Sequence, residues 1–356
     1  MKFLRSGLAT FAPYVPGQQP ADGESWIKLN TNESPYPPSP RVSEAIKQAS
    51  DESRRLYPSP TAAPARAAIA NRFGLRAEQI ALGNGSDELL AMAFRAFVDP
   101  GQPVAFAIPT YPILGPLAGI HGAEVRSHPL TDGWQLPPAL AADSAPLKFI
   151  VNPNSPTGTF YSHEAISAVV KESSGVVVLD EAYVDFGPKS GIDLLDRFDN
   201  LLILRTMSKS YALCGMRIGW AMGNPELIAA LDTVKDSYNL NRLAIVAAVA
   251  AIEDREYHAQ LVAKVIESRI WLEAELRNLG FRVEPSETNF LFVRPPEGTS
   301  AATVFEVLKK ARILVRSFDR PPTEGWLRIT IGTPAELETL VAALTRLLDE
   351  PRGVRS

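Results

Sequence analysis

Short apolar runs alternate with helical segments from about residue 65 of this chain onwards. The runs lie at 79–82, 104–107, 148–151, 175–179, 200–204 and 218–222. Several of them are apolar on both faces, as expected for parallel strands that helices cover on each side. The alternation therefore predicts an α/β layered domain around a mostly parallel sheet.

The two ends of the chain follow different patterns. Residues 1–64 are rich in proline, which fixes φ and removes a hydrogen-bond donor, so we expect an extended arm with one short helix near 42–50. Residues 241–280 predict long helical structure that is broken near 253–256 and ends at Gly280. Strands at 281–283, 289–293, 313–315 and 326–331 and helices at 300–311 and 334–349 then predict a smaller α+β domain.

The chain is long enough for more than one domain. Its 356 residues exceed the usual size of a single small domain. The patterns divide it into an N-terminal extended arm over 1–40, a large domain over 41–270 and a small C-terminal domain over 271–356. We expect the arm to join the small domain or a partner subunit.

Composition argues against several classes of protein. Apolar residues make up 46% and charged residues 21%, and a net charge of −4 gives no basic field for nucleic acid. No apolar run reaches the length of a membrane span, and residues 1–12 lack the features of a signal peptide. Cys214 is the only cysteine, and the four histidines show no metal-ligand spacing, so we expect them on the surface or in loops. These features predict a cytoplasmic protein with no metal, no membrane partner and no nucleic-acid partner.

The chemistry is expected where the strands end. In open α/β sheets, ligands bind beyond the carboxyl ends of the strands. Polar or aromatic residues follow most of the apolar runs at that point. These segments are 83–88 (Gly-Asn-Gly-Ser-Asp-Glu), 109–111 (Pro-Thr-Tyr), 152–158 (Asn-Pro-Asn-Ser-Pro-Thr-Gly), 180–183 (Asp-Glu-Ala-Tyr) and 205–209 (Arg-Thr-Met-Ser-Lys). Their coincidence predicts a single site.

Two of these segments suit an anion and a flat ring. Gly85, Ser86 and Asp87 form either a simple turn with a helix N-cap or a cradle in which backbone N–H groups and the positive helix end face a phosphate. Glu88 stands where the dinucleotide-binding fingerprint requires its third glycine, so that motif is absent. Tyr111 is either a packed loop aromatic or a side chain that stacks on a flat heterocycle.

Two further strand ends carry charged groups. Asp180 ends a strongly apolar strand, where a carboxylate has a desolvation cost unless it has a partner. It is either a cap or local ion pair, or a carboxylate that holds a pyridine nitrogen protonated while Tyr183 offers its hydroxyl to the same ring. Lys209 follows the next buried strand, and Arg217 lies where a cation completes an anion cradle. Together these four residues favour a functional lysine over a solvated surface charge.

The segments, in this order, resemble those of the fold-type-I aminotransferases, which depend on pyridoxal 5'-phosphate. Further stretches are similar to the histidinol-phosphate aminotransferase subfamily, and the resemblance covers about residues 5–348. These stretches are 12–17 (Ala-Pro-Tyr-Val-Pro-Gly), 30–40, 57–60, 235–242 and 313–316 (Ile-Leu-Val-Arg), whereas 327–329 (Leu-Arg-Ile) is the last of the segments shared with the wider fold-type-I group. The resemblance implies an α/β fold with a large α/β/α domain that binds the cofactor and a small C-terminal α+β domain.

The resemblance also implies roles for individual residues. Lys209 would carry the cofactor as a Schiff base and act as acid and base, while Asp180 would pair with the pyridine nitrogen and Tyr183 with the ring oxygen. The remaining contacts to the cofactor would come from Gly85, Ser86, Asp87, Tyr111, Asn154, Thr206, Ser208, Arg217 and, from the other subunit, Tyr57. The substrate would be held by Tyr14, Asn32, Tyr57, Arg316 and Arg328. A Tyr57 that crosses between subunits implies a homodimer.

The sequence departs from the subfamily pattern at three positions. Ser155 stands where an asparagine usually precedes Pro-Thr-Gly and contacts the ring oxygen, so either its hydroxyl makes this contact or Asn154 moves in. Ser34 stands where the subfamily often has asparagine, and Pro37 where it often has glycine. The last two departures concern the substrate rather than the cofactor.

The reaction that the resemblance implies transfers an amino group from L-histidinol phosphate to 2-oxoglutarate. The products would be imidazole acetol phosphate and L-glutamate, and the pathway histidine biosynthesis. An aminotransferase for aromatic or other amino acids and a threonine-phosphate decarboxylase-like enzyme are alternatives on the same fold. A non-catalytic sensor of pyridoxal phosphate would be fused to a DNA-binding domain, and we expect none here.

Overall fold

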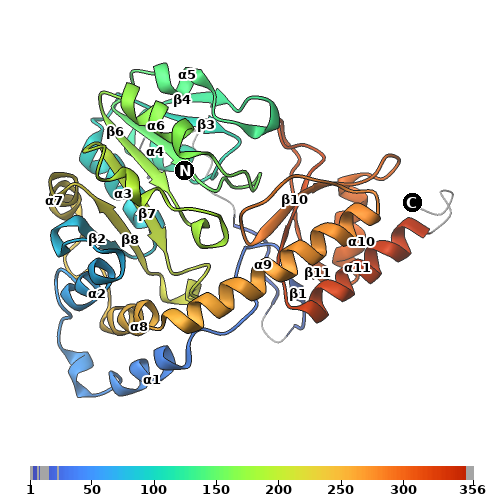
Figure 1. The fold of residues 1–356 in the computed structure, drawn as a ribbon, viewed down its shortest axis with the longest axis horizontal. Helices are drawn as coiled ribbons and strands as arrows, with labels where there is room; N and C mark the ends of the chain where they lie inside the picture. The colour runs from blue at the N-terminus through green and yellow to red at the C-terminus, as the bar shows by residue number, and fades with distance from the viewer. Residues whose placement is uncertain (1–2, 6–7, 9–15, 22–23, 350–356) are drawn as a thin grey trace.

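A seven-stranded sheet forms the larger region of the chain, of which the computed structural model describes residues 3–5, 8, 16–21 and 24–349 (Figure 1). The strand order is β2-β8-β7-β6-β5-β3-β4. These strands are β2 (Ile80–Gly83), β3 (Pro103–Ile108), β4 (Glu124–Pro129), β5 (Leu147–Val151), β6 (Val176–Asp180), β7 (Leu201–Thr206) and β8 (Gly219–Gly223). β8 alone runs opposite to the other six strands, so the prediction of a mostly parallel sheet is confirmed.

Helices cover both faces of this sheet. Along β6, Val177 and Leu179 point to one face and Val178 to the other, because successive side chains of a strand alternate. One face packs against α2 (Ala63–Phe73), α5 (Pro138–Ala142), α6 (His163–Glu172) and α8 (Arg242–Glu253). The other packs against α3 (Ser86–Phe97), α4 (Leu114–His121) and α7 (Pro225–Val234). This double cover explains why the central strands are apolar at nearly every position.

The smaller region is a four-stranded antiparallel sheet with the order β12-β13-β10-β9. Its strands are β9 (Arg282–Val283), β10 (Phe290–Arg294), β12 (Arg316–Ser317) and β13 (Leu327–Thr330). The helices that pack on it are α9 (Arg255–Asn278), α10 (Ala301–Lys310) and α11 (Pro334–Asp349). α9 passes from the large region to the small one (Figure 1).

Part of the N-terminal segment packs with the small region. The short strand β1 (Ile27–Lys28) pairs in parallel with β11 (Ile313–Leu314), and the chain then runs to α1 (Pro40–Gln48) on the large region. Ser39 caps α1 by accepting the N–H of Arg41. The boundaries proposed for the arm and the two domains stay a prediction, and α9 continues unbroken through residue 270.

The large sheet contains one strand that the pattern did not predict, and the two-residue strands β1 and β12 were not predicted either. β4 is a half-exposed edge strand with the sequence Glu-Val-Arg-Ser-His-Pro, so it lacks the apolar run of its neighbours. The predicted break in the long helical stretch is confirmed at Asp254, where ψ turns to 67° between α8 and α9. Among the residues that the structure describes, no helix has the length and apolar character needed to cross a membrane.

Candidate active site

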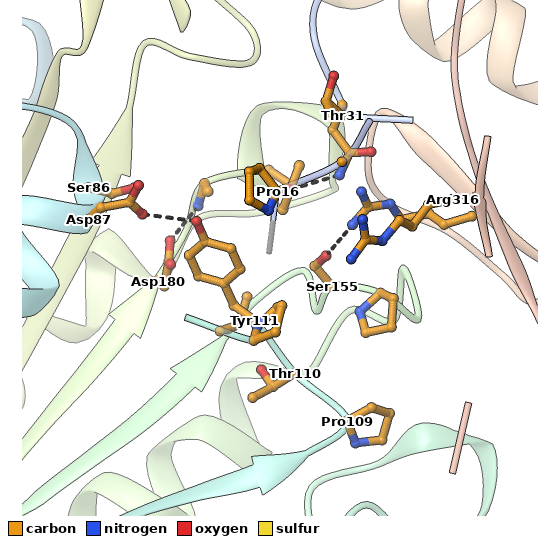
Figure 2. Close-up of a pocket in the computed structure, with 18 of the residues that line it drawn as sticks. Pro16, Thr31, Ser86, Asp87, Pro109, Thr110, Tyr111, Ser155, Asp180 and Arg316 are labelled. Atoms are coloured by element: carbon orange, nitrogen blue, oxygen red, sulfur yellow. Dashed lines mark hydrogen bonds between the residues drawn. The ribbon is translucent and has the colours of Figure 1, made fainter. Parts of the chain in front are cut away.

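A cavity of about 750 Å³ lies where the carboxyl ends of β3, β5, β6 and β7 face the small sheet (Figure 2). Most of the residues predicted for the site line it, although they come from distant parts of the sequence. They are Asn32, Ser86, Asp87, Tyr111, Ser155, Asp180, Tyr183, Thr206, Ser208, Lys209, Arg217, Arg316 and Arg328. The strand ends thus meet in one place, as parallel strands in one sheet require.

Three of the predicted residues that the structure describes do not line this cavity. Gly85 lies against Arg217, which does line the cavity. Tyr57 is 77% exposed and stacks on Tyr238, with ring centroids 4.5 Å apart. Asn154 is buried, and Tyr14 lies outside the described residues.

Asp180 is a buried carboxyl group at the end of β6. Its Oδ1 accepts the N–H of Ala182 at 3.0 Å, and no described cation lies within ion-pair distance of it. Burial raises the pKa of Asp180 to about 7, nearby Asp87 and Glu181 add to this shift, and Lys209 offsets only part of it. This carboxyl group is therefore suited to a ligand that brings its own cationic N–H donor.

Lys209 lies in the loop that follows β7, next to the same carboxyl group. Its Nζ is 3.5 Å from the carbonyl oxygen of Thr31 and 5.7 Å from the ring centroid of Tyr183. Tyr183 is held by Asn32, whose Nδ2 donates to its hydroxyl at 2.9 Å, and by an edge-on contact with Phe290. A primary amine, a phenol and a buried acid thus share one end of the cavity.

An anion cradle forms beside these groups. α3 begins at Ser86, so its first backbone N–H groups face the cavity. Arg217 donates from Nη1 to the Ser208 hydroxyl at 3.3 Å and from Nη2 to Asp87 at 3.4 Å. Thr206 accepts the N–H of Ser208 at 3.1 Å. Backbone amides, two hydroxyls and a guanidinium are the donors that a phosphate requires.

Two glycines allow this cradle to close. A Cβ at Gly85, which has φ +85°, would lie 2.5 Å from Nη2 of Arg217. A Cβ at Gly219 of β8 would lie 2.6 Å from the backbone nitrogen of Ser86. The bare backbone at both positions therefore seats Arg217 and keeps the amides of α3 accessible.

Tyr111 forms one wall of the cavity. Its hydroxyl donates to Oδ1 of Asp87 at 3.0 Å, which fixes the ring beside the cradle (Figure 2). The ring is therefore placed to lie along a flat ligand between the cradle and Asp180.

An arginine pair lies on the small-sheet side. Arg316 of β12 and Arg328 of β13 are direct partners in the antiparallel register, so both side chains leave the same face of the sheet. Arg328 donates to Oγ of Ser155 at 3.3 Å and to the carbonyl oxygen of Asn30 at 3.1 Å. Figure 2 shows Arg316 and Ser155 across the cavity from Asp180.

The structure separates Ser155 from Asn154. Asn154 is 1% exposed, and its amide is used inside the protein by Thr110, Thr157 and the carbonyl oxygen of Pro109. The hydrogen bonds of Asn154 thus hold the loop, and Ser155 is the neighbour that lines the cavity, while the choice between the two for the contact with the ring oxygen stays a prediction.

Sequence reasoning missed the backbone contribution of the N-terminal segment. The carbonyl oxygens of Asn30 and Thr31 accept from Arg328 and Lys209, and both residues line the cavity. No pattern of side chains signals such contacts, since a carbonyl is present at every residue.

Comparison with known proteins agrees with this geometry. A family model described as aminotransferase class I and II matches residues 24–344. The chain is 44% identical over 344 residues to the histidinol-phosphate aminotransferase of Geotalea uraniireducens (strain Rf4), covering 97% of this chain and 99% of that protein. It is 46% identical over 354 residues to histidinol-phosphate aminotransferase 2 of Dechloromonas aromatica (strain RCB), covering 97% and 99%.

A solved structure has the same fold. The crystal structure of histidinol-phosphate aminotransferase from Sinorhizobium meliloti in complex with pyridoxal-5'-phosphate matches with a TM-score of 0.84 and 29% identity, covering 90% of each chain. The fold, the family model and the relatives agree with each other and with the strand-end site. The chain therefore belongs to the class I and II aminotransferase family and, within it, to the histidinol-phosphate aminotransferases.

Proposed function

We propose that this protein is a pyridoxal-phosphate-dependent transaminase that moves the amino group of L-histidinol phosphate to 2-oxoglutarate in histidine biosynthesis. One observation carries the proposal. A single cavity holds the amine of Lys209 and the buried acid Asp180 at one end and the paired Arg316 and Arg328 at the other. Membership of the histidinol-phosphate aminotransferases supports the choice of substrate.

The residues present fit the cofactor. Pyridoxal phosphate combines a phosphate, a flat pyridine ring and an aldehyde, and the cavity offers a cradle, an aromatic wall and an amine. When bound, the cofactor supplies an aldehyde that reacts with amines and a protonated ring that accepts electrons from a broken Cα–H bond. Burial raises the pKa of Asp180 to about 7 in the protein alone, and a cationic ring N–H that donates to this carboxyl group would favour its ionised form.

Each holding residue has a separate task. The phosphate would be held by the amides at the start of α3, the hydroxyls of Thr206 and Ser208 and the guanidinium of Arg217. Tyr111 would lie along the ring, and the Tyr183 hydroxyl, oriented by Asn32, would donate to the ring oxygen. Asp180 keeps the ring nitrogen protonated.

Lys209 moves the proton that transamination requires. With the cofactor bound, its Nζ would take a proton from Cα of the amino donor and pass it to the cofactor carbon that bears the nitrogen, and in the second half it would return a proton from that carbon to Cα of the oxo acid. The carbonyl oxygen of Thr31 orients the amine between these events. Asp180 stays ionised throughout and does not exchange protons with the substrate.

Arg316 and Arg328 bind the anionic ends of both substrates. Histidinol phosphate carries a phosphate and 2-oxoglutarate carries two carboxylates, and a planar guanidinium forms paired hydrogen bonds with either group. Ser155 and Asn30 orient Arg328, so its donor fork meets each substrate in turn at one place.

Further parts of the proposal concern assembly and location. Tyr57 is exposed and lies away from the cavity of its own chain, which supports a role at the phosphate of a partner subunit in a homodimer. Tyr14 would help to hold the phosphate arm of the substrate. A cytoplasmic location follows from the pathway.

A substrate panel tests the proposal. Purified protein with pyridoxal phosphate and 2-oxoglutarate should turn over histidinol phosphate faster than phenylalanine, tyrosine or threonine phosphate. Faster turnover of an aromatic amino acid would replace the substrate and leave the transaminase chemistry intact. Release of carbon dioxide from threonine phosphate would instead indicate a decarboxylase.

A further inference from the structure

A cluster of charged residues lies behind the cavity and takes no part in the chemistry proposed above. We call Glu181, Asp185 and Arg205 the rear cluster. The guanidinium of Arg205 is buried between two aromatic rings, 5.1 Å from the ring centroid of Phe73 and 5.7 Å from that of Trp220. None of the three residues lines the cavity, yet each is close in sequence to a residue that does.

Asp185 is the centre of this cluster. Its Oδ1 pairs with Nη2 of Arg205, at the end of β7. Its Oδ2 accepts the hydroxyl of Ser210 at 2.5 Å and lies 3.5 Å from Nε2 of His258 on α9. One carboxylate therefore joins the loop after β6, the end of β7, the loop that carries Lys209 and the helix that leads to the small sheet.

The charges in the cluster balance each other. Burial alone would raise the pKa of Asp185, but Arg205, the nearby imidazole of His258 and the hydrogen bond from Ser210 hold it well below its usual range. Burial likewise opposes the charge of Arg205, but Asp185 and Glu181 outweigh it and raise the pKa of that guanidinium. Both groups thus stay charged and fixed, as a rigid support requires.

A second carboxylate anchors the cluster on the other side. Glu181 directly follows Asp180 and lies 4.0 Å from Nε of Arg205. It accepts the N–H of Gly191 at 2.5 Å and the hydroxyl of Ser190 at 2.7 Å. Arg205 thus bridges the segment that carries Asp180 to the segment that carries Lys209.

We propose that Asp185 and Ser210 are positioning residues that fix the separation between the amine of Lys209 and the carboxyl group of Asp180. Ser210 is the residue next to Lys209, and Asp185 is in the loop that begins at Asp180. A hydrogen bond between them removes the relative motion of these two loops. The inference rests on the proposed function of Lys209 and Asp180.

The test removes one hydroxyl from each side of the cluster. Ser210→Ala deletes the bond to Asp185, and Ser190→Ala is the matched control, because it deletes the same kind of bond to Glu181 away from Lys209. We expect Ser210→Ala to lower kcat for histidinol phosphate about tenfold with KM little changed, since small misplacements of reacting groups have large costs. Ser210→Thr, which keeps the hydroxyl, should restore most of the rate.

A spectroscopic readout separates positioning from simple loss of stability. The visible absorbance of bound pyridoxal phosphate is titrated with pH, because its midpoint depends on how far the amine at 209 lies from the carboxyl group at 180. The midpoint should shift in Ser210→Ala and stay at the wild-type value in Ser190→Ala. Wild-type kcat and midpoint in Ser210→Ala would overturn the inference, as would equal rate losses in both variants with neither midpoint shifted. Failure of the wild type to transaminate histidinol phosphate would overturn the proposed function instead, and the midpoints would still decide the positioning role.

Discussion

Asp180 and Asp185 are carboxyl groups in one loop region, but the cavity and the rear cluster give them opposite properties. Asp180 faces the cavity with one backbone hydrogen bond, and burial raises its pKa to about 7. Asp185 faces Arg205, Ser210 and His258, and its pKa lies well below the usual range despite burial. The difference shows that the partner, and not burial alone, decides which acid is structural and which waits for a ligand.

This contrast has an energetic meaning. A buried carboxyl group without a cation lowers stability at neutral pH, whereas a buried group that is fully paired maintains it. Asp180 in the cavity therefore lowers the stability of the cofactor-free protein, whereas Asp185 in the rear cluster maintains it. The residue proposed to act in the reaction and the residue proposed to support the fold are thus different acids. Substituting each acid in turn tests this separation.

The largest expected effect is the fall in kcat when Asp180 is substituted. Asp180→Asn keeps the shape of the side chain but removes the charge that holds a ring nitrogen protonated. We expect kcat to fall about 10²–10³-fold, the size of loss typical for a group that stabilises developing charge. Steady-state kinetics checks this, with bound cofactor quantified after denaturation. Wild-type kcat in this variant would remove Asp180 from the mechanism.

The next largest expected effect is the loss of unfolding free energy when Asp185 is substituted. Asp185→Asn leaves Arg205 buried beside only one carboxylate, and breaking a buried pair costs roughly 3–5 kcal/mol of unfolding free energy. Because the folded pKa of Asp185 is depressed, its contribution is present above the unfolded pKa and is lost as pH falls below about 4. Urea unfolding of the cofactor-free protein across pH measures this difference.

An exposed ion pair provides the control. Oδ2 of Asp193 lies 2.9 Å from Nζ of Lys189 on the surface, and both side chains are more than half exposed. Asp193→Asn should leave the unfolding free energy close to the wild-type value, since surface pairs contribute little. An equal loss from Asp193→Asn and Asp185→Asn would contradict a special role for the rear cluster.

In the same unfolding assay, Asp180→Asn should raise the unfolding free energy, whereas Asp185→Asn should lower it. The folded pKa of Asp180 is raised to about 7, so the stability from this group is complete below the unfolded pKa and is lost as pH rises through 7. The variant escapes that loss, so the cofactor-free protein should gain roughly 2–4 kcal/mol relative to the wild type above pH 7 and nothing below pH 4. Destabilisation at pH 8 would show that Asp180 has a structural partner.

The smallest expected effect is a change in KM, and it concerns the two arginines of the cavity and the rear cluster. Arg205 is fixed within the rear cluster, whereas Arg328 lies at the cavity. Arg328→Lys keeps the charge but loses the planar donor fork, so we expect KM for both substrates to rise about tenfold with kcat less affected. Arg320→Lys, an exposed position at the edge of the cavity, is the control. Unchanged KM values in Arg328→Lys would place substrate binding elsewhere.

The sequence predicted those features of the fold and site that depend on a single strand. Apolar runs predicted the central strands within one or two residues, and the strand ends identified Lys209 and Asp180 because a polar residue after a buried strand is conspicuous. β4 was missed because an edge strand need not be apolar.

Features made by several segments were not predictable from the sequence. Arg205 is a charged residue inside a buried strand, and only the fold reveals that Asp185 and two aromatic rings enclose it. His258 was expected on the surface or in a loop, which is wrong: it lies in α9 and stacks on Tyr211 with ring centroids 4.0 Å apart. Such contacts depend on tertiary geometry, which no local pattern encodes.

Trapping the cofactor on the protein tests the central claim most directly. Purified wild-type protein is incubated with pyridoxal phosphate, reduced with borohydride, digested and analysed by mass spectrometry. We predict one added cofactor per chain, on the peptide that contains Lys209, and none in Lys209→Ala. A label on another lysine, or equal labelling of the variant, would contradict the account.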